Sequence, residues 1–191
     1  IINEADRLQN LMNRMLTPHQ MPIYKKTNIH EILERVRSLI LSEFSTDIAF
    51  VRDYDVSLPE FVVDREKLIQ AILNIARNGA QAMKQNKQEE MKLSFVTRAE
   101  RQIVFRKKKH ATAIRIDIID NGPGIKNELI DKIFFPLVTG NENGSGLGLS
   151  LAQNLIALHQ GMIDCHSVPG KTIFSIILPI ENNLEPTKDK K

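Results

Sequence analysis

The chain has 191 residues, of which 42% are hydrophobic, and its 26 Lys and Arg against 23 Asp and Glu leave a net charge of +3. This composition is typical of one globular domain with an appendage, and so mild a charge gives no reason to expect nucleic acid as a partner. No apolar run approaches the roughly 18 residues that a membrane-spanning helix needs. We therefore expect a cytoplasmic protein without membrane contact, and the single cysteine, Cys165, fits a reducing compartment.

The first segment is predicted to be a helix that ends near Thr17-Pro18. Its apolar residues recur at spacings of four and three, as in the seam of a helical bundle, although an amphipathic helix docked on its own domain gives the same pattern. Because the chain begins at Ile1 rather than Met, we interpret residues 1–17 as the truncated end of a longer bundle helix. A linker over 18–26 follows.

Residues 27–181 are predicted to form one domain in which helices alternate with strands. Asn28 and Glu31 have the spacing of a capping box at a helix start, with His30 as an exposed residue of the cap, and Asp64 is a good N-cap for a helix over 65–84. Between and after these helices, apolar alternation predicts strands over 48–52, 61–63, 91–97, 102–105 and 112–119. Helices over 126–134 and 147–159, the second ended by Gly161, precede a hairpin of 162–167 with 172–178.

The tail over 182–191 is polar and is expected to be flexible. Because the strands come partly in hairpins, the expected fold class is a two-layer α/β sandwich, with helices covering one face of a mixed sheet.

An amide stripe runs along the helix over 65–84. Gln70, Asn74, Asn78 and Gln81 recur at spacings of four, four and three within an otherwise apolar helix, where uncharged amides are costly unless they are satisfied. Asn oxygens can coordinate a hard cation such as Mg²⁺, and hydrogen bonding to a neighbouring loop would also explain the stripe.

Two glycine clusters suggest a nucleotide. Asp120 ends a strand and opens a tight glycine turn, so its carboxylate could accept from an exocyclic amine, or it could simply form the turn. Gly144, Gly146 and Gly148 precede a helix whose free N–H groups would cradle phosphate. The joint occurrence of amide stripe, Asp-containing turn and cradle is far more specific than any one of them.

At these residues the sequence resembles the ATP-binding domain of sensor histidine kinases, with its Bergerat-type fold, in the superfamily that includes gyrase, Hsp90 and MutL. The stretch 64–83 is similar to the family's N box, 120–125 to its G1 box, 133–136 to its F box and 144–149 to its G2 box. Finer features, including Arg52-Asp53-Tyr54-Asp55, resemble the nitrogen-regulation kinases among them.

The resemblance implies ATP and Mg²⁺ as cofactors, Asn74 and Asn78 as catalytic residues, and Asn78 as the metal ligand. It implies that Asp120 binds the adenine amine, that residues from about 127 to 145 form a lid over ATP, and that further residues contact the nucleotide. These further residues are Gly122, Gly124, Ile125 and Thr172 at the base, and Gly144, Ser145, Gly146, Leu147 and Gly148 at the phosphates.

Asn74 bears on the reaction, because relatives that hydrolyse ATP carry Glu there, and an amide cannot act as that base. None of the five histidines has the setting of a phosphoacceptor, which is a His followed by an acidic residue and soon by Pro. The resemblance therefore implies transfer of the γ-phosphoryl to a histidine outside this chain and then to an aspartate of a response regulator. The implied partners are the phosphoacceptor helix of the same kinase dimer, a receiver domain and a PII-type regulator. A non-catalytic module that senses adenine nucleotide and a superfamily ATPase are the alternatives.

Overall fold

The computed structural model describes residues 21–44, 48–105, 108–139, 145–180 and 184–187. The predicted bundle helix over 1–17 lies outside these ranges, as do residues 140–144, which include Gly144 and belong to the later part of the predicted lid. Among the described residues, no helix is both long and apolar enough to cross a membrane.

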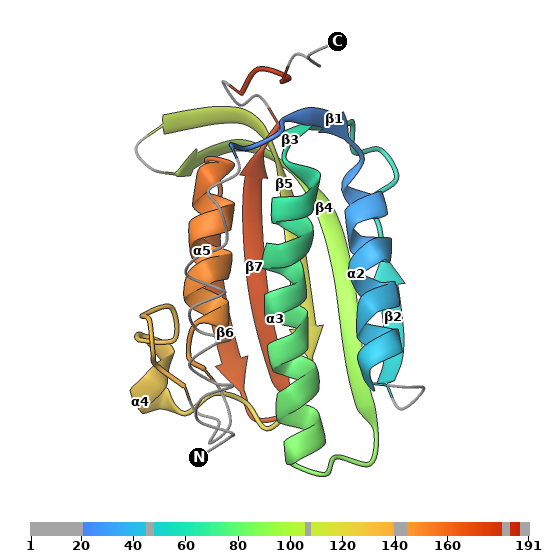
Figure 1. Ribbon diagram of the computed structural model, residues 1–191, viewed down its shortest axis with the longest axis vertical. Coiled ribbons are helices and arrows are strands. Elements are labelled where there is room, and N and C mark those ends of the chain that lie inside the picture. The colour runs from blue at the N-terminus through green and yellow to red at the C-terminus, as the bar shows by residue number, and fades with distance from the viewer. Residues whose placement is uncertain (1–20, 45–47, 106–107, 140–144, 181–183, 188–191) are drawn as a thin grey trace.

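The domain has two layers, with a five-stranded mixed sheet behind a row of three helices (Figure 1). The strand order is β2-β4-β5-β7-β6, in which β2 and β4 are parallel and all other neighbours are antiparallel. The expected fold class is confirmed. The strands are β2 Ile48–Asp53, β4 Met91–Phe105, β5 Lys108–Asp120, β6 Met162–Val168 and β7 Lys171–Pro179.

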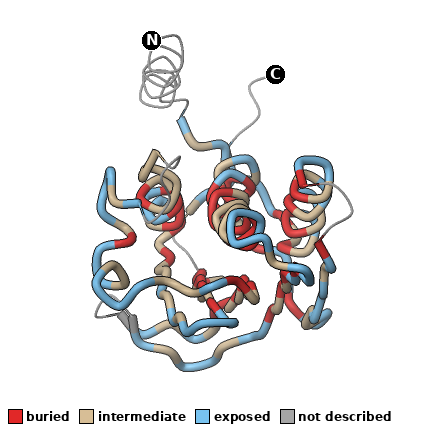
Figure 2. Tube along the Cα trace, turned by 90° about the horizontal axis from the view of Figure 1, so that it is seen from below, coloured by how far each residue is buried: buried red, intermediate tan, exposed pale blue. Residues whose placement is uncertain are grey.

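Apolar side chains between the two layers form the core. Figure 2 shows the buried residues on the sides of the helices that face the sheet, and the exposed residues on the outside. The long helices are α2 Ile29–Phe44, α3 Arg65–Gln85 and α5 Gly148–Leu158, and α4 Asn127–Ile130 is a single short turn. The six apolar residues on one face of α2 are buried, which follows from their helical period: Ile29, Ile32, Leu33, Val36, Ile40 and Phe44.

Alternation along β5 delivers Asp120 to the helix side of the sheet. Ile114, Ile116 and Ile118 are buried under the helices, as their period of two predicts. Asp120 continues this series and is paired with Leu93 of β4 and Thr172 of β7. This end of the sheet thus carries two polar side chains, Asp120 and Thr172, on its core face.

The β4–β5 arm, residues 101–105 and 108–112, extends past the sheet, because β7 ends at Pro179 opposite Ala113 (Figure 1). The sequence predicts two strands over 91–97 and 102–105, whereas β4 is one strand from Met91 to Phe105. The predicted break falls at 98–101, where Arg98, Glu100 and Arg101 interrupt the apolar alternation by which strands are recognised.

A second, two-stranded sheet forms where the described chain begins. β1 Lys25–Thr27 pairs antiparallel with β3 Phe61–Val63, so the end of the predicted linker is a strand. Thr187 lies beside this segment, although the sequence predicts a flexible tail over 182–191: its N–H donates to the Tyr24 carbonyl at 2.8 Å, and its Oγ1 accepts from the Tyr24 N–H at 2.9 Å. These bonds are between residues 163 apart, which no local pattern reveals.

Asp64 joins three parts of the chain. One carboxylate oxygen accepts from the Lys67 N–H at 3.1 Å and caps α3, as predicted, while the other accepts from the Ile23 N–H at 2.9 Å. The Asp64 N–H donates to Nε2 of the buried His159 at 3.0 Å, so Nδ1 of that ring carries the proton and donates to the Leu155 carbonyl at 2.7 Å. We call Ile23, Asp64 and His159 the Asp64 hub; it fixes the start of α3 to the end of α5.

The helices around the glycine clusters differ from prediction at their ends. The helix expected over 126–134 ends at Ile130. α5 ends in a Schellman motif, in which the Gln160 N–H donates to Ala157 and the Gly161 N–H to Ile156, each at 3.0 Å. Gln160 rather than Gly161 adopts the left-handed conformation, with φ 59°. Gly161 is required for another reason, because a Cβ there would lie 2.6 Å from Leu178 Cδ2.

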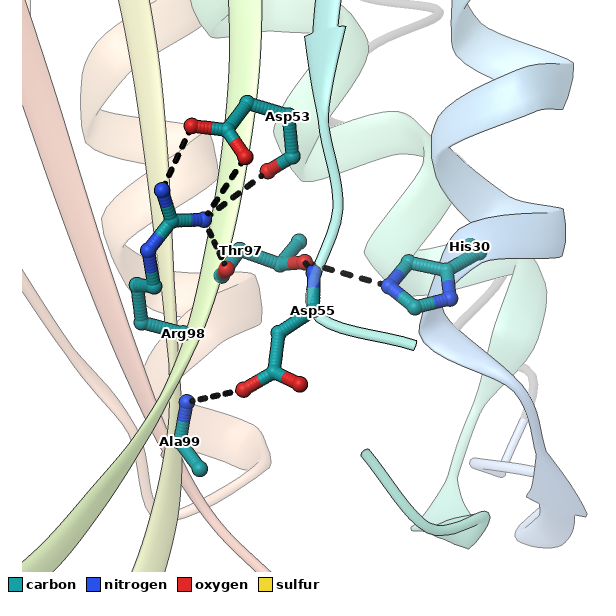
Figure 3. Close-up of polar contacts among 6 residues, drawn as sticks. All are labelled: His30, Asp53, Asp55, Thr97, Arg98 and Ala99. Atoms are coloured by element: carbon teal, nitrogen blue, oxygen red, sulfur yellow. Dashed lines mark hydrogen bonds and ion pairs between the residues drawn. The ribbon is translucent and has the colours of Figure 1, made fainter. Parts of the chain in front are cut away.

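His30 is not the exposed residue that the sequence predicts. Its ring stacks on Tyr54 at 4.7 Å between centroids, and Nε2 lies 3.1 Å from the buried hydroxyl of Thr97 (Figure 3). That hydroxyl also accepts from the Asp55 N–H at 2.9 Å, so His30 helps to fix the loop after β2. Asn28 does cap the helix, through a bond from the His30 N–H to its side chain at 2.9 Å.

The Asp64 hub predicts a pH dependence of stability. Burial lowers the pKa of His159, although the Leu155 carbonyl and Asp64 oppose this effect and the nearby Lys67 adds to it. The unfolded chain binds a proton at this residue below about pH 6.5, where folded His159 is still neutral, so the free energy of unfolding falls as pH drops through this window. Urea denaturation between about pH 7.5 and about pH 5.5 should show a shallower decline in His159→Gln than in the unsubstituted chain. Equal slopes would contradict the assignment.

Candidate functional site

The amide stripe of α3 divides by exposure. Gln70 is exposed, Asn78 and Gln81 are half-buried, and Asn74 is 6% exposed. Asn74 Nδ2 is buried and has no hydrogen-bond partner among the described residues. Leaving such a donor unpaired costs roughly 1–3 kcal/mol. The described chain therefore leaves Asn74 able to bind something further, and the loop-bonding explanation of the stripe does not account for this atom.

Asn78 lies against the start of α5. A Cβ placed on Gly148, the first residue of that helix, would be 3.8 Å from both the oxygen and the nitrogen of the Asn78 amide. No described side chain caps α5, so within the described part of the chain the N–H groups of its first turn keep their hydrogen-bonding capacity, at the positive end of the helix dipole. An amide oxygen beside such a helix end suits a cation and an anion bound together.

The remaining cradle residues pack against the segment that follows α4. Gly146 has φ 65°, and its carbonyl accepts from the Leu137 N–H at 3.0 Å. A Cβ on Gly146 would lie 2.5 Å from the Leu137 carbonyl carbon, so only glycine fits there. Ser145 Oγ accepts a long 3.4 Å bond from the Leu147 N–H. The structure thus places four of the five predicted cradle residues together, and Gly144 lies outside the described ranges.

Asp120 is buried at the other end of the site. Its side chain is 6% exposed, and Oδ1 accepts from the Gly122 N–H at 2.9 Å. Burial raises the pKa of the Asp120 carboxyl, and the Gly122 bond partly opposes that rise. A Cβ on Gly79 would lie 2.9 Å from Oδ2, and one on Gly122 would lie 2.8 Å from Oδ1. Two glycines therefore make the space that the carboxylate occupies.

The β6–β7 hairpin holds the glycine turn that follows Asp120. The Gly170 N–H donates to the Gly122 carbonyl at 2.9 Å, and a Cβ on Gly124 would lie 2.9 Å from the Val168 carbonyl carbon. The Ile125 N–H donates to Ser167 Oγ, also at 2.9 Å. Backbone contacts this close give the turn one position relative to the sheet.

Helix α3 joins the two ends of the site. The adjacent residues Asn78 and Gly79 face the start of α5 and the Asp120 carboxylate respectively. A ligand that bridges these ends would have a hydrogen-bonding group beside Asp120 and an anionic group beside α5. At one end Asp120 contacts Gly122 and pairs with Thr172, and at the other Asn78 lies against Gly148.

Two residues of the site are missed by sequence reasoning. Gly79 has a signal in retrospect, because glycine inside a helix is costly unless packing requires it. Ser167, whose Oγ lies 2.9 Å from Thr172 Oγ1, has none beyond the register of the hairpin, in which it faces Thr172.

Gly79→Ala tests the packing of α3 on Asp120. Replacing glycine by alanine inside a helix normally stabilises it by about 1 kcal/mol. Here the new Cβ would meet the carboxylate, so we expect the free energy of unfolding to fall by about 1–3 kcal/mol instead. Gly148→Ala is the matched control, because its Cβ would meet Asn78 at an ordinary 3.8 Å. Urea denaturation that finds Gly79→Ala as stable as the control would refute this packing.

The sequence profile described as "Histidine kinase-, DNA gyrase B-, and HSP90-like ATPase" matches residues 63–182. Among curated proteins, the chain is 47% identical over 180 residues to the sensory histidine kinase/phosphatase NtrB of Vibrio alginolyticus and 44% identical to that of Salmonella typhimurium. Each alignment covers 94% of this chain and 51% of the relative. The chain thus spans about half the length of these relatives.

Solved structures have the same fold. The catalytic domain of histidine kinase ThkA superposes with a TM-score of 0.65 at 24% identity, covering 82% of this chain and 97% of that one. Full-length ShkA in complex with AMPPNP superposes with a TM-score of 0.70 at 21% identity, covering 97% and 38%. With the profile match over most of its length, the chain belongs to the histidine kinase-, DNA gyrase B- and HSP90-like ATPase family, as an ATP-binding domain.

Proposed function

We propose that this chain binds Mg-ATP and donates the γ-phosphoryl group to a histidine of a sensor histidine kinase, from which it passes to a response-regulator aspartate. The observation that carries the proposal is the position of the Asn78 amide beside the uncapped N-terminus of α5. This pairing of an oxygen ligand with free backbone donors suits a metal-bound polyphosphate.

The residues present fit Mg-ATP at both ends of the site. Asn78 would hold the metal through its amide oxygen, because Mg²⁺ takes oxygen ligands together with water and phosphate. The buried Nδ2 of Asn74 would gain the partner that the described chain lacks for it. When bound, Mg²⁺ neutralises charge that develops on the phosphate oxygens.

At the base end, Asp120 would accept from the adenine amine. A buried carboxylate is costly, and a ligand amine that bonds it recovers part of that cost. Gly122, Gly124 and Ile125 would contribute backbone beside the ring, where the hairpin holds their turn in place. The chain would therefore bind ATP in one orientation, with its base under α3 and its phosphates at α5.

The described part of the site supplies positioning and backbone donors. Asn74 stands on α3 one helical turn before Asn78, and its amide cannot remove a proton from water. Phosphoryl transfer needs mainly positioning and charge neutralisation, which this arrangement can provide. Transfer to an acceptor is thus favoured over hydrolysis.

The proposed partners are those of a longer protein, of which this chain would be one domain. The curated NtrB relatives are about twice as long as this chain, which leaves room for the phosphoacceptor helix of a kinase dimer. Histidine kinase ThkA, which superposes with a TM-score of 0.66 at 22% identity over 94% of this chain and 49% of that one, was solved in complex with response regulator protein TrrA. That complex supports a receiver domain as the second partner, and the resemblance to nitrogen-regulation kinases adds a PII-type regulator.

Asn78→Ala should abolish phosphoryl transfer to a supplied acceptor-helix protein. Losing a group that holds charge in place at the reacting phosphates costs on the order of 100-fold in rate. Radiolabel transfer from ATP, followed on a gel, measures this loss. Gln70→Ala is the matched control, because Gln70 lies on the same stripe but is exposed, and its labelling should be unchanged.

Other outcomes point to the other functions. Full labelling with Asn78→Ala would overturn the metal assignment. Nucleotide binding without any labelling by the unsubstituted chain would favour a regulatory module, and steady phosphate release without an acceptor would favour an ATPase.

A further inference from the structure

Ser167 links the glycine turn to Thr172. It lies on β6 opposite Thr172 of β7, and its side chain is on the same face of the sheet as the core. Its Oγ accepts from the Ile125 N–H at 2.9 Å and lies 2.9 Å from Thr172 Oγ1. Among the described side chains, Ser167 therefore links the turn that follows Asp120 to Thr172 of β7.

Counting protons shows what this bond can do. A hydroxyl has one proton and two lone pairs, and either Ser167 or Thr172 could donate across the 2.9 Å contact. If Thr172 donated, it would have no proton left for a ligand. If Ser167 donates, Thr172 keeps its own proton for another acceptor.

Asp120 favours the second arrangement. Thr172 is the Cα partner of Asp120 across β5 and β7, and both side chains are buried on the core face, at 3% and 6% exposure. Hydroxyl dipoles orient in the local field, so the Asp120 carboxylate favours a Thr172 proton on its own side of the residue rather than on the side of Ser167. No hydrogen bond joins Thr172 to Asp120 among the described residues, so this proton stays available to a ligand. The result is a donor, Thr172, beside an acceptor, Asp120.

We propose that Ser167 is a specificity-determining residue, which selects adenine over guanine by making Thr172 a hydrogen-bond donor beside the Asp120 acceptor. This inference rests on the proposed function, since it concerns the base end of the same site. Ser167 acts through Thr172 and is a positioning residue.

The chemistry of the two bases explains the selection. Adenine presents an amine donor next to a ring-nitrogen acceptor, so it matches an acceptor and a donor side by side. Guanine presents a carbonyl oxygen where adenine has the amine, and this oxygen would face the Asp120 carboxylate. A site built to hydrogen-bond one pattern rejects the other, because buried polar groups are then left unpaired.

Calorimetric titration of this chain with Mg-ATP and Mg-GTP tests the proposal. Without the Ser167 proton, Thr172 can turn, so Ser167→Ala should reduce the preference for ATP over GTP by roughly fivefold. Ser167→Thr keeps the hydroxyl and should retain the preference. Ser175→Ala is the matched control, because Ser175 stands on β7 but bonds Asp117 at 2.7 Å on the other face of the sheet. Thermal denaturation verifies that each variant is folded.

Thr172→Val keeps the shape of Thr172 and removes the same donor directly. It should lower the preference to a similar degree, and adding it to Ser167→Ala should cause little further loss, because the two residues act as a unit. If Ser167→Ala left the preference for ATP unchanged, or weakened the binding of both nucleotides equally, the proposed role of Ser167 would be wrong while the proposed function would stand. If the unsubstituted chain bound neither nucleotide, the proposed function would fail together with this inference.

Discussion

A carboxylate enclosed between two layers is the constraint on which the site depends. Asp120 ends a strand whose three preceding inward side chains, Ile114, Ile116 and Ile118, are isoleucine, and its charge is removed from water by α3 above it. Such a group is tolerated only where its surroundings satisfy it and leave it space. Gly79 and Gly122 provide the space, and the Gly122 N–H provides a bond. The close approach of α3 to the sheet follows from these glycines.

That approach also places the rest of the site. Since Gly79 sits over Asp120, the preceding residue of α3 is turned toward α5, and the two ends of the site lie a fixed distance apart. The hairpin contributes the third wall through Gly170 and Ser167. In the proposed function, recognition of the base at one end and charge neutralisation at the other would both depend on one helix packed against one sheet, which suits a reaction that depends on position.

Sequence periodicity predicts those helices and strands of this fold that have one buried and one solvent-exposed face. The buried stripe of α2 and the alternation of β5 were predicted correctly because burial imposes a helical or a strand period. The strand over 102–105 was predicted correctly, but the break before it was wrong, because Arg98, Glu100 and Arg101 interrupt the apolar alternation although β4 continues through them paired with β5. The stacking of His30 on Tyr54 was missed because the two residues come together only in the tertiary structure.

The site was predictable to the extent that its chemistry is carried by glycines and by unusual polar residues. Asp120, Asn78 and the glycine cradle have local signatures, since turns and free helix ends require particular residue types. Ser167 has no such signature, because its partners, Ile125 and Thr172, are defined by hairpin register. The left-handed Gln160 was likewise missed, because glycine is the usual residue there and the following glycine offered the simpler explanation.

The Asp64 hub changes how loss-of-function variants of this domain should be read. The hydrogen bonds of His159 go to Asp64 and Leu155, which lie outside the proposed nucleotide site. Asp64 caps the helix that carries Asn74 and Asn78, and His159 itself stands at the far end of the helix that begins with Gly148. In the proposed function, a genetic screen for loss of activity would therefore recover variants at His159 as well as at the proposed ligand contacts. Distance from the proposed nucleotide site is therefore a poor guide to the effect of a substitution in this domain. The same holds for Ile23, because its N–H bonds the Asp64 carboxylate.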